Sequence, residues 1–209
     1  MFDLTPTDVA GSVLDCASGP SSFNAEATCK GYRVVSCDPI YRFSSEEIAN
    51  CIEETYEVIL AGVRTNKARY VWDRIGSPEE LGEVRMVAMR RFLEDFPQGF
   101  ALGRYRTDAL PDLGCEDDEF ALALCSHLLF TYSEQLTLDF HVASIKEMCR
   151  VADEARIFPL LNYDGEQSPR FVPVVEELRA QGYETKVRPV PYEFQRGGDR
   201  LLSVSRQYR

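Results

Sequence analysis

Short apolar runs alternate with segments of helical periodicity along most of this chain. Runs rich in apolar residues predict strands at 12–15, 33–37, 100–105, 120–125 and 154–161. Helices are predicted at 22–30, 138–152 and 173–181, where apolar residues recur at helical spacing or glycine follows the last residue. The more continuous runs are typical of strands buried on both faces of a parallel sheet. The pattern therefore predicts an α/β fold with a doubly wound, Rossmann-like, mostly parallel sheet.

The last part of the chain shows a different pattern. Two extended runs, 183–191 and 200–205, flank the sequence Arg196-Gly197-Gly198-Asp199. Glycine and aspartate are typical turn residues. We therefore expect an antiparallel hairpin added to the parallel sheet.

The segment from Ser44 to Phe96 is longer than a simple connection between neighbouring strands requires. Ser44-Ser45-Glu46-Glu47 and Ser77-Pro78-Glu79-Glu80 are both typical helix starts. Two or three helices are expected here, lying over the carboxyl end of the sheet as a lid. Because 209 residues fit one domain of ordinary size, we predict a single domain over 1–209 with a helical lid insertion at 44–98.

Composition narrows the function classes. The formal net charge of -11 and the isoelectric point of about 4.7 argue against a general nucleic-acid binder. No apolar run is long enough to span a bilayer, and the N-terminus lacks the pattern of a signal peptide. The seven cysteines form no Cys-x-x-Cys pair, which favours reduced core thiols and a cytoplasmic location. A metal site is not expected, since neither of the two histidines lies near a cysteine pair.

Two of the predicted strands end on a carboxylate. The run Val13-Leu14-Asp15 precedes a loop of small residues at 17–22, and the run 33–37 precedes Asp38. In open α/β sheets, ligands bind beyond the carboxyl ends of the strands, where small residues admit close approach and an acid binds ribose hydroxyls. The loop is also explained as a tight strand-to-helix turn, and Asp38 as a turn or cap aspartate.

Two further segments carry polar residues at the same expected edge. Asp108 and Ala109 suit an adenine ring, with the carboxylate accepting from the exocyclic amine, although aspartate is common in turns. His127 follows the fourth run and could act as a base, orient a substrate or only pack against a ligand. Tyr132 could place its hydroxyl on an acceptor or serve as a packed aromatic. His141, beside an apolar helix face, is interpreted as a satisfied structural histidine.

Together these segments resemble the class I S-adenosylmethionine-dependent methyltransferases over most of the chain. Val13 to Phe23 resembles the first motif of the family, and Asp38 resembles its ribose-binding acid. Thr107 to Pro111 resembles the adenine segment, and Glu116 to Phe120 resembles the acidic run into the fourth strand. Cys125 to Leu129 resembles the fourth motif, and Met148 to Val151 resembles the end of the following helix. The first motif departs from the usual Gly-x-Gly form, since this chain has Ala17-Ser18-Gly19-Pro20.

The resemblance implies a seven-stranded sheet whose last strand is antiparallel, with S-adenosylmethionine as the cofactor. It places Asp15 and Gly19 near the methionine part, Asp38 on the ribose, and Asp108 with Ala109 at the adenine. The full set of expected cofactor-binding residues is Asp15, Ala17, Gly19, Pro20, Phe23, Asp38, Pro39, Asp108, Ala109, Cys125 and Ser126. His127 and Tyr132 are the candidate catalytic residues, and no metal is expected.

The leading hypothesis is direct methyl transfer to a small-molecule acceptor, with the lid forming the acceptor pocket. The cations of the lid could hold an anionic acceptor or could simply form a solvated helix face; they are Arg64, Lys67, Arg69 and Arg74. The alternative is a non-catalytic module that binds S-adenosylmethionine or S-adenosylhomocysteine and acts through a partner. A nicotinamide-dependent enzyme is disfavoured, because no Gly-x-Gly-x-x-Gly follows the first strand. Neither membrane association nor a particular oligomeric state is indicated.

Overall fold

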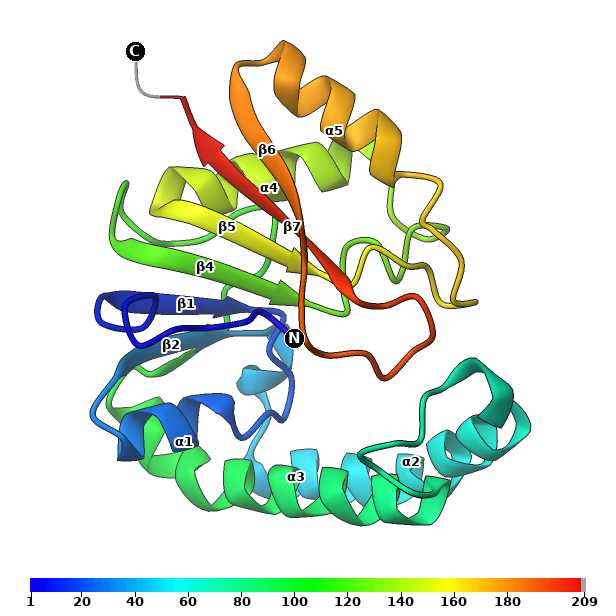
Figure 1. The fold of residues 1–209 in the computed structure, drawn as a ribbon. Helices are drawn as coiled ribbons and strands as arrows, with labels where there is room; N and C mark the ends of the chain where they lie inside the picture. Colours follow the sequence, from blue (N-terminus) through cyan, green and yellow to red (C-terminus); the bar gives the residue numbers. More distant parts are fainter. Residues whose placement is uncertain (208–209) are drawn as a thin grey trace.

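The computed structural model describes residues 1–207, in which a central seven-stranded sheet is covered by helices (Figure 1). The strands are β1 (Ser12–Cys16), β2 (Arg33–Cys37), β3 (Tyr105–Arg106), β4 (Phe120–Ser126), β5 (Ala152–Phe158), β6 (Tyr183–Pro189) and β7 (Arg200–Arg206). Their order is β3-β2-β1-β4-β5-β7-β6, and β7 runs antiparallel to both of its neighbours. The expected α/β fold, with a mostly parallel sheet and an antiparallel last strand, is therefore confirmed.

Within residues 1–207, five α-helices connect or flank these strands. They are α1 (Phe23–Cys29), α2 (Ser45–Thr65), α3 (Pro78–Ala101), α4 (Leu138–Val151) and α5 (Phe171–Ala180), with short 3-10 helices at Pro39–Arg42 and Lys67–Arg69. None of the helices in the described range is long and apolar enough to cross a membrane.

Both faces of the sheet are buried, as the continuous apolar runs predict. Successive side chains of a strand point to opposite faces. Val13 of β1 accordingly joins the apolar cluster on the face of α1, whereas Leu14 joins the larger cluster on the face of α4 and α5. Because helices cover both faces of the sheet, the ends of the central strands are the parts of the sheet that remain open.

Two predicted strands differ from the structure. Residues 100–105 do not form one strand, because α3 continues through Pro97 to Ala101 and only Tyr105 and Arg106 pair with β2. A proline inside a helix removes one backbone hydrogen bond, and here the helix continues past it. The fifth strand begins at Ala152, directly after α4, and ends at Phe158 rather than at residue 161.

The predicted C-terminal hairpin is present, but its connection is long. β6 and β7 pair from Tyr183 with Arg206 to Pro189 with Arg200. The connection then leaves the sheet and reaches the segment after α2, where Gln195 forms a bridge with Tyr70. Residues 196–199 are therefore one part of a longer connection between β6 and β7, and they do not form a tight turn between the two strands.

Helices α2 and α3 form an antiparallel pair, which we call the helical hairpin (residues 45–101). Ser44 caps α2 with a full capping box to Glu47, and Ser77 caps α3, as the sequence predicts. Near the sheet, the hairpin packs through Phe92 and Phe96 on Tyr105. Its other end extends past the carboxyl ends of the strands (Figure 1).

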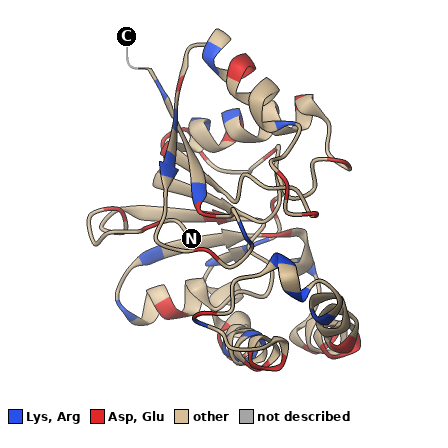
Figure 2. Cartoon of the chain, turned by 45° about the vertical axis from the view of Figure 1, so that its right-hand side comes forward, with Lys and Arg blue, Asp and Glu red and all other residues tan. Residues whose placement is uncertain are grey.

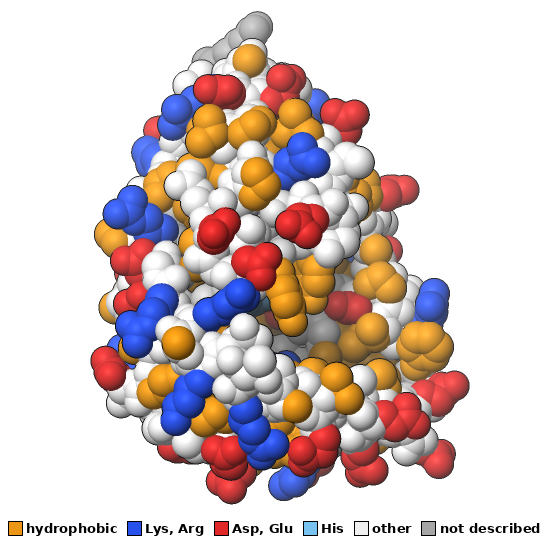
Figure 3. Space-filling model, turned by 90° about the vertical axis from the view of Figure 1, so that its right-hand side faces the viewer, with side chains coloured by type: hydrophobic (Ala, Val, Ile, Leu, Met, Phe, Trp, Pro, Cys, Tyr) orange, Lys and Arg blue, Asp and Glu red, His pale blue; other side chains and the backbone are white. Residues whose placement is uncertain are grey.

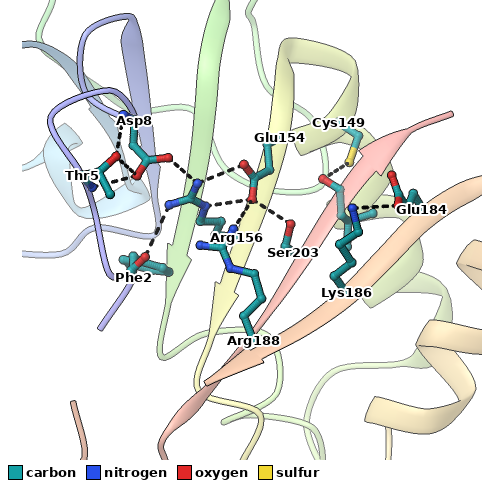
Figure 4. Close-up of polar contacts among 11 residues, drawn as sticks. Phe2, Thr5, Asp8, Cys149, Glu154, Arg156, Glu184, Lys186, Arg188 and Ser203 are labelled. Carbon is teal, nitrogen blue, oxygen red and sulfur yellow. Dashed lines mark hydrogen bonds and ion pairs between the residues drawn. The ribbon is translucent and has the colours of Figure 1, made fainter. Parts of the chain in front are cut away.

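The N-terminal segment is held against the sheet by a buried arginine (Figure 4). Arg156 of β5 is only 4% exposed in its side chain, and its Nε lies 2.8 Å from Oε1 of Glu154. The same guanidinium pairs with Asp8 and donates to the carbonyl of Phe2. A buried charge needs such partners, because an unpaired one would carry a large desolvation penalty. This network fixes residues 2–8 beside the central strands.

Candidate functional site

The loop after β1 adopts a backbone conformation that favours glycine. Ala17 has φ +54° and Gly19 has φ +58°. A non-glycine residue in this left-handed region is uncommon and carries strain, and such strain is frequent at functional sites. A Cβ at Gly19 would meet no atom within 4 Å, so this glycine borders open space.

The loop is fixed by side chains from two other elements. The backbone N–H of Gly19 donates to Oδ2 of Asp38 at 3.0 Å. The hydroxyl of buried Tyr41 donates to the carbonyl oxygen of Gly19 at 2.7 Å. Asp38 also accepts from the backbone N–H of Ile40 at 2.9 Å, so its carboxylate caps the 3-10 helix that Pro39 begins. Asp38, which directly follows β2, and the loop after β1 thus form one rigid unit.

Asp15 is a buried carboxyl directly below this loop. Burial raises its pKa to about 6, and the negative charge of Asp38 adds to the increase. Hydrogen bonds oppose the shift, the strongest from Ser18, whose Oγ lies 2.5 Å from Oδ2 of Asp15. Asp15 is therefore mostly ionised at neutral pH and becomes protonated in mild acid.

The end of β4 carries a second strained residue. His127 has φ +55°, its N–H donates to the carbonyl of Phe158 at 2.8 Å, and its Nδ1 lies 2.6 Å from the hydroxyl of Ser126. Although the ring has accessible surface, the surrounding protein lowers its pKa to about 4, with a smaller contribution from Arg85. The ring is neutral at pH 7.

Three cysteines lie side by side where the central strands end. Cys16 is in register with Cys37 of β2 and with Cys125 of β4. All three are buried, and burial raises the pKa of Cys125 to about 12. They are core thiols, as predicted, and any contact of Cys125 with a ligand has to come from its backbone.

The predicted adenine segment uses its acid internally. Oδ2 of Asp108 accepts from Nε of Arg106 at 2.7 Å, and Oδ1 accepts from the N–H of Gly114 at 3.3 Å. Ala109, next in the chain, is half-buried. A ligand amine at Asp108 would therefore share a carboxylate that already has two partners.

The remaining predicted residues occupy varied positions. Pro20 lies half-buried in the loop after β1, and Phe23 begins α1 and packs partly against the core. Tyr132 is 43% exposed and has no side-chain hydrogen bond to another described residue. His141 is fully buried, with its ring nitrogens 2.7 Å and 2.8 Å from two backbone carbonyls, which confirms its structural role.

The molecule is hollowed on the face where the strands end (Figure 3). Between them, helices α2 and α3 enclose a small apolar cavity of about 30 Å³, lined among others by Ile52, Ile59, Val63, Leu81, Met86 and Met89. One cation, Arg85, lines it as well. Sequence reasoning missed Arg85; the available signal was an arginine in an otherwise apolar stripe of its helix.

The lid cations singled out in the sequence have partners within the protein, and Figure 2 shows how Lys and Arg are distributed along the chain. Arg64 pairs with Glu79 at 2.8 Å, and Arg69 pairs with Asp164 at 3.0 Å. Arg74 donates to the carbonyl of Pro191, and Lys67 lies over the ring of Trp72. Because these groups have partners within the protein, their arrangement favours a structural role over anion binding.

The tip is also joined to the connection between β6 and β7. The rings of Tyr70 and Phe194 stack with centroids 5.0 Å apart, and Trp72 meets Phe194 edge to face at 5.6 Å. The N–H of Val71 donates to the carbonyl of Phe194 at 2.7 Å. We call this contact the latch (residues 69–72 with 194–196). Residues far apart in sequence form it, so sequence patterns did not predict it.

The fold and topology define a Rossmann-like, doubly wound α/β protein. No family model matches the sequence. The chain is 33% identical over 207 residues to the uncharacterized protein MJ0045 of Methanocaldococcus jannaschii, a match that covers 99% of this chain and 90% of that protein. The chain belongs to the same family as this protein.

Solved structures with a similar arrangement are described as methyltransferases. An S-adenosylmethionine-dependent methyltransferase from Methanosarcina mazei is 14% identical, with a TM-score of 0.49 over 99% of this chain and 100% of that one. The 1,6-didemethyltoxoflavin-N1-methyltransferase of Burkholderia thailandensis, solved with bound 1,6-didemethyltoxoflavin and S-adenosylhomocysteine, is 13% identical, with a TM-score of 0.46 over 95% of this chain and 72% of that one. Similarity at this level assigns no activity to this chain.

Proposed function

We propose that the chain binds S-adenosylmethionine at the carboxyl ends of β1, β2 and β4 and transfers its methyl group to a small-molecule acceptor. The observation that carries this proposal is the arrangement of Gly19 and Asp38. The loop after β1 borders open space at Gly19, and the acid that ends β2 lies against that loop. A small-residue loop joined to such an acid suits a nucleoside cofactor in this fold.

The side chains at this edge fit the chemical groups of that cofactor. Asp15 supplies a carboxylate for the ammonium group of the methionine part, since its pKa of about 6 leaves it mostly ionised at neutral pH. Asp38 would hold the ribose hydroxyls, and Asp108 with Ala109 would meet the adenine. The loop has a left-handed backbone at Ala17 and Gly19, and at Gly19 it borders the open space proposed for the cofactor.

S-adenosylmethionine supplies an electrophilic methyl group when it is bound. The protein then mainly has to align a nucleophile and exclude water. His127 is neutral at pH 7, and its Nδ1 is oriented by the Ser126 hydroxyl. In the tautomer whose proton is on Nδ1, the Nε2 atom can accept a hydrogen bond from the acceptor, and a pKa of about 4 makes this ring a positioning group and a weak base. Tyr132 provides a second hydroxyl after the same strand.

A small acceptor is supported by the shape and charge of the protein. The latch joins the helical hairpin to the β6–β7 connection. The net charge of -11 disfavours a nucleic-acid acceptor.

The test is formation of S-adenosylhomocysteine. The purified protein is incubated with S-adenosylmethionine and fractions of a small-metabolite extract, and the product is measured by mass spectrometry. We expect product only in certain fractions and none without an acceptor. Cofactor binding without product in any fraction would instead favour the non-catalytic binding module.

A further inference from the structure

Two buried polar side chains, Asn24 of α1 and Ser36 of β2, lie beside the carboxyl of Asp15. Neither of the two is exposed to solvent. Ser36 is the register partner of Asp15 in the β1–β2 pair, so both side chains point to the face of the sheet that α1 covers. On the other side of Asp15, the register partner is the apolar Leu124 of β4. Ser36 is therefore the polar neighbour that the strands themselves supply to Asp15.

The orientation of the Asn24 amide is determined by its neighbours. The guanidinium of Arg104 donates to Oδ1 of Asn24 at 2.5 Å, and a guanidinium has no acceptor atom. On the other side of the amide, Nδ2 donates to the backbone carbonyls of Val34 at 3.2 Å and of Arg104 at 3.0 Å. Carbonyl oxygens can only accept, so both sides require the same orientation. The atom of Asn24 that faces Ser36 is therefore the donor Nδ2.

This orientation determines where the Ser36 hydroxyl can donate. Nδ2 of Asn24 donates to Oγ of Ser36 at 3.2 Å. A hydroxyl whose oxygen accepts from one neighbour has its single hydrogen available for another acceptor. Ser36 forms that second hydrogen bond with the carboxyl of Asp15. The chain of hydrogen bonds therefore has one direction, from Arg104 through Asn24 and Ser36 to Asp15.

The outer end of this chain is anchored on the helical hairpin. NH2 of Arg104 lies 2.7 Å from Oδ1 of Asp95 on α3, and the hydroxyl of Tyr105 donates to the same carboxylate at 2.8 Å. The guanidinium is thus held between Asp95 and Asn24. Turning the Asn24 amide over would place its NH2 group against the guanidinium, two donors facing each other, so the orientation is stable.

No positive charge stands among the other ionisable groups that act electrostatically with Asp15. These groups are Asp38, Tyr41, Cys16 and Cys125. Burial raises the pKa of Asp15 to about 6, and Asp38 adds to the increase. Among the described residues, Ser18 and Ser36 act in the opposite direction, each through a side-chain hydrogen bond. Donation to a carboxylate favours its ionised form, so these two hydroxyls are what keeps Asp15 charged.

We propose that Asn24 and Ser36 are positioning residues of the proposed cofactor site, which direct a hydroxyl toward Asp15 and keep its carboxyl ionised for the cationic methionine part of S-adenosylmethionine. Both residues act through Asp15 from inside the protein. This inference rests on the proposed function, because it assigns to Asp15 the ammonium group of that cofactor.

The first test measures Asp15 itself, without any ligand. The carboxyl carbon of Asp15 is followed by NMR in a pH titration of the full chain, and its signal is assigned by its absence in Asp15→Asn. Ser36→Ala should raise the pKa of Asp15 by about one unit, as for the loss of one hydrogen bond to a charged group. Ser12→Ala is the matched control. Ser12 lies on the same strand as Asp15 but donates to the carbonyl of Glu119 at 3.0 Å, so its removal should leave the titration unchanged.

A second variant tests whether Asn24 acts through Ser36. Asn24→Leu has a similar volume and removes the amide without adding a charge. It should raise the pKa of Asp15 in the wild-type background and have no further effect in Ser36→Ala. Ser36→Ala removes only one hydroxyl and is expected to fold, so it still decides the proposal if Asn24→Leu does not fold.

The second readout is the pH dependence of cofactor affinity, measured by calorimetric titration with S-adenosylmethionine. The affinity of wild type should fall as the pH drops below about 6, where Asp15 becomes protonated. In Ser36→Ala this fall should begin about one pH unit higher, while the affinity well above that pH stays as in wild type. A merely structural role of Ser36 would instead lower the affinity by the same factor at every pH.

The proposal is overturned if Ser36→Ala leaves the titration of Asp15 unchanged, or if Ser12→Ala moves it equally. It is also overturned if Ser36→Ala lowers the affinity by the same factor at every pH. If S-adenosylmethionine binds at no pH but the titration of Asp15 still moves in Ser36→Ala, the proposed function fails and the effect of Ser36 on Asp15 remains.

Discussion

The backbone N–H of Gly19 donates to Oδ2 of Asp38 at 3.0 Å, so the loop after β1 and the acid that ends β2 form one unit. Tyr41 fixes the same glycine from the opposite side through its carbonyl oxygen. A ligand at this edge therefore meets a preorganised surface, and it need not order the loop when it binds. The proposed cofactor site depends on this pairing.

Adding a side chain at Gly19 should abolish cofactor binding with only a modest loss of stability. In Gly19→Val the new atoms enter the open space proposed for the cofactor, and the backbone at φ +58° becomes strained. Gly31→Val is a matched control, since Gly31 has φ +84° and open space but lies after α1, away from the site. Both variants should lose about 1 kcal/mol of unfolding free energy. Retained S-adenosylmethionine binding in Gly19→Val would contradict the assignment.

Affinity for S-adenosylmethionine should depend on pH through Asp15. The ammonium group of the ligand is attracted only by the ionised carboxyl, whose pKa is about 6 in the folded protein. Affinity should therefore fall by up to about tenfold per pH unit as the pH drops below about 6. Calorimetric titrations across this range should show the dependence in wild type and a flat, weaker profile in Asp15→Asn.

Asp15 should also lower stability at neutral pH. Its folded pKa is raised above the unfolded value, so its contribution to stability is present below the unfolded pKa and is lost as the pH rises through about 6. Asp15→Asn removes the cost of the buried charge and should be on the order of 2 kcal/mol more stable than wild type at neutral pH. Denaturant unfolding at neutral pH and at about pH 4 measures this, and the gain should shrink in acid. A gain that stays constant with pH would exclude the ionisation of Asp15 as its cause.

His127→Asn should lower methyl transfer without moving its pH profile. Because the pKa of His127 is about 4, this ring stays neutral across the neutral range and its titration does not shape activity there. Asparagine tolerates the positive φ of this position better than most residues, so the fold should be kept. A pH–rate profile with a step near the usual histidine pKa that disappears in His127→Asn would show that His127 acts as a base.

The pairing of Arg156 with Asp8 should make attachment of the N-terminal segment sensitive to acid. The guanidinium and the Thr5 hydrogen bonds lower the pKa of Asp8 to about 2 against the opposing effect of burial. The contribution to stability is therefore present above the unfolded pKa and is lost as the pH falls toward about 2. Asp8→Asn should cost on the order of 1 kcal/mol at neutral pH, allowing for solvent screening. Equal unfolding free energies of both proteins at neutral pH would contradict this role.

The sequence predicted the parts of the fold that depend on local patterns. β1, β2 and β4 are continuous apolar runs, and their ends place Asp15, Gly19 and Asp38 at one edge of the sheet. The strand expected at 100–105 was wrong because Pro97, normally a helix breaker, lies inside α3, so the run after it was interpreted as a new element. Strong local signals were reliable, and an unusual residue inside an element was misleading.

Long-range contacts could not be predicted in the same way. The latch joins Tyr70 to Phe194, and nothing in either segment indicates the other. The position of Arg85 at the α2–α3 cavity depends on how the two helices pack, which a helical pattern does not specify. The four cations chosen for their clustering in sequence turned out to bind neighbouring groups of the protein, because proximity in sequence says little about which charges remain free.

The most direct test of the account is calorimetric titration of the full chain with S-adenosylmethionine, repeated with Asp38→Ala. Asp153→Ala serves as the control, since Asp153 is exposed and has no ion pair within the described residues. We predict clear binding to wild type and to Asp153→Ala, and loss of binding in Asp38→Ala, which lacks both the proposed ribose acid and the anchor of Gly19. Absence of binding to wild type, or unchanged binding in Asp38→Ala, would contradict the proposed cofactor site.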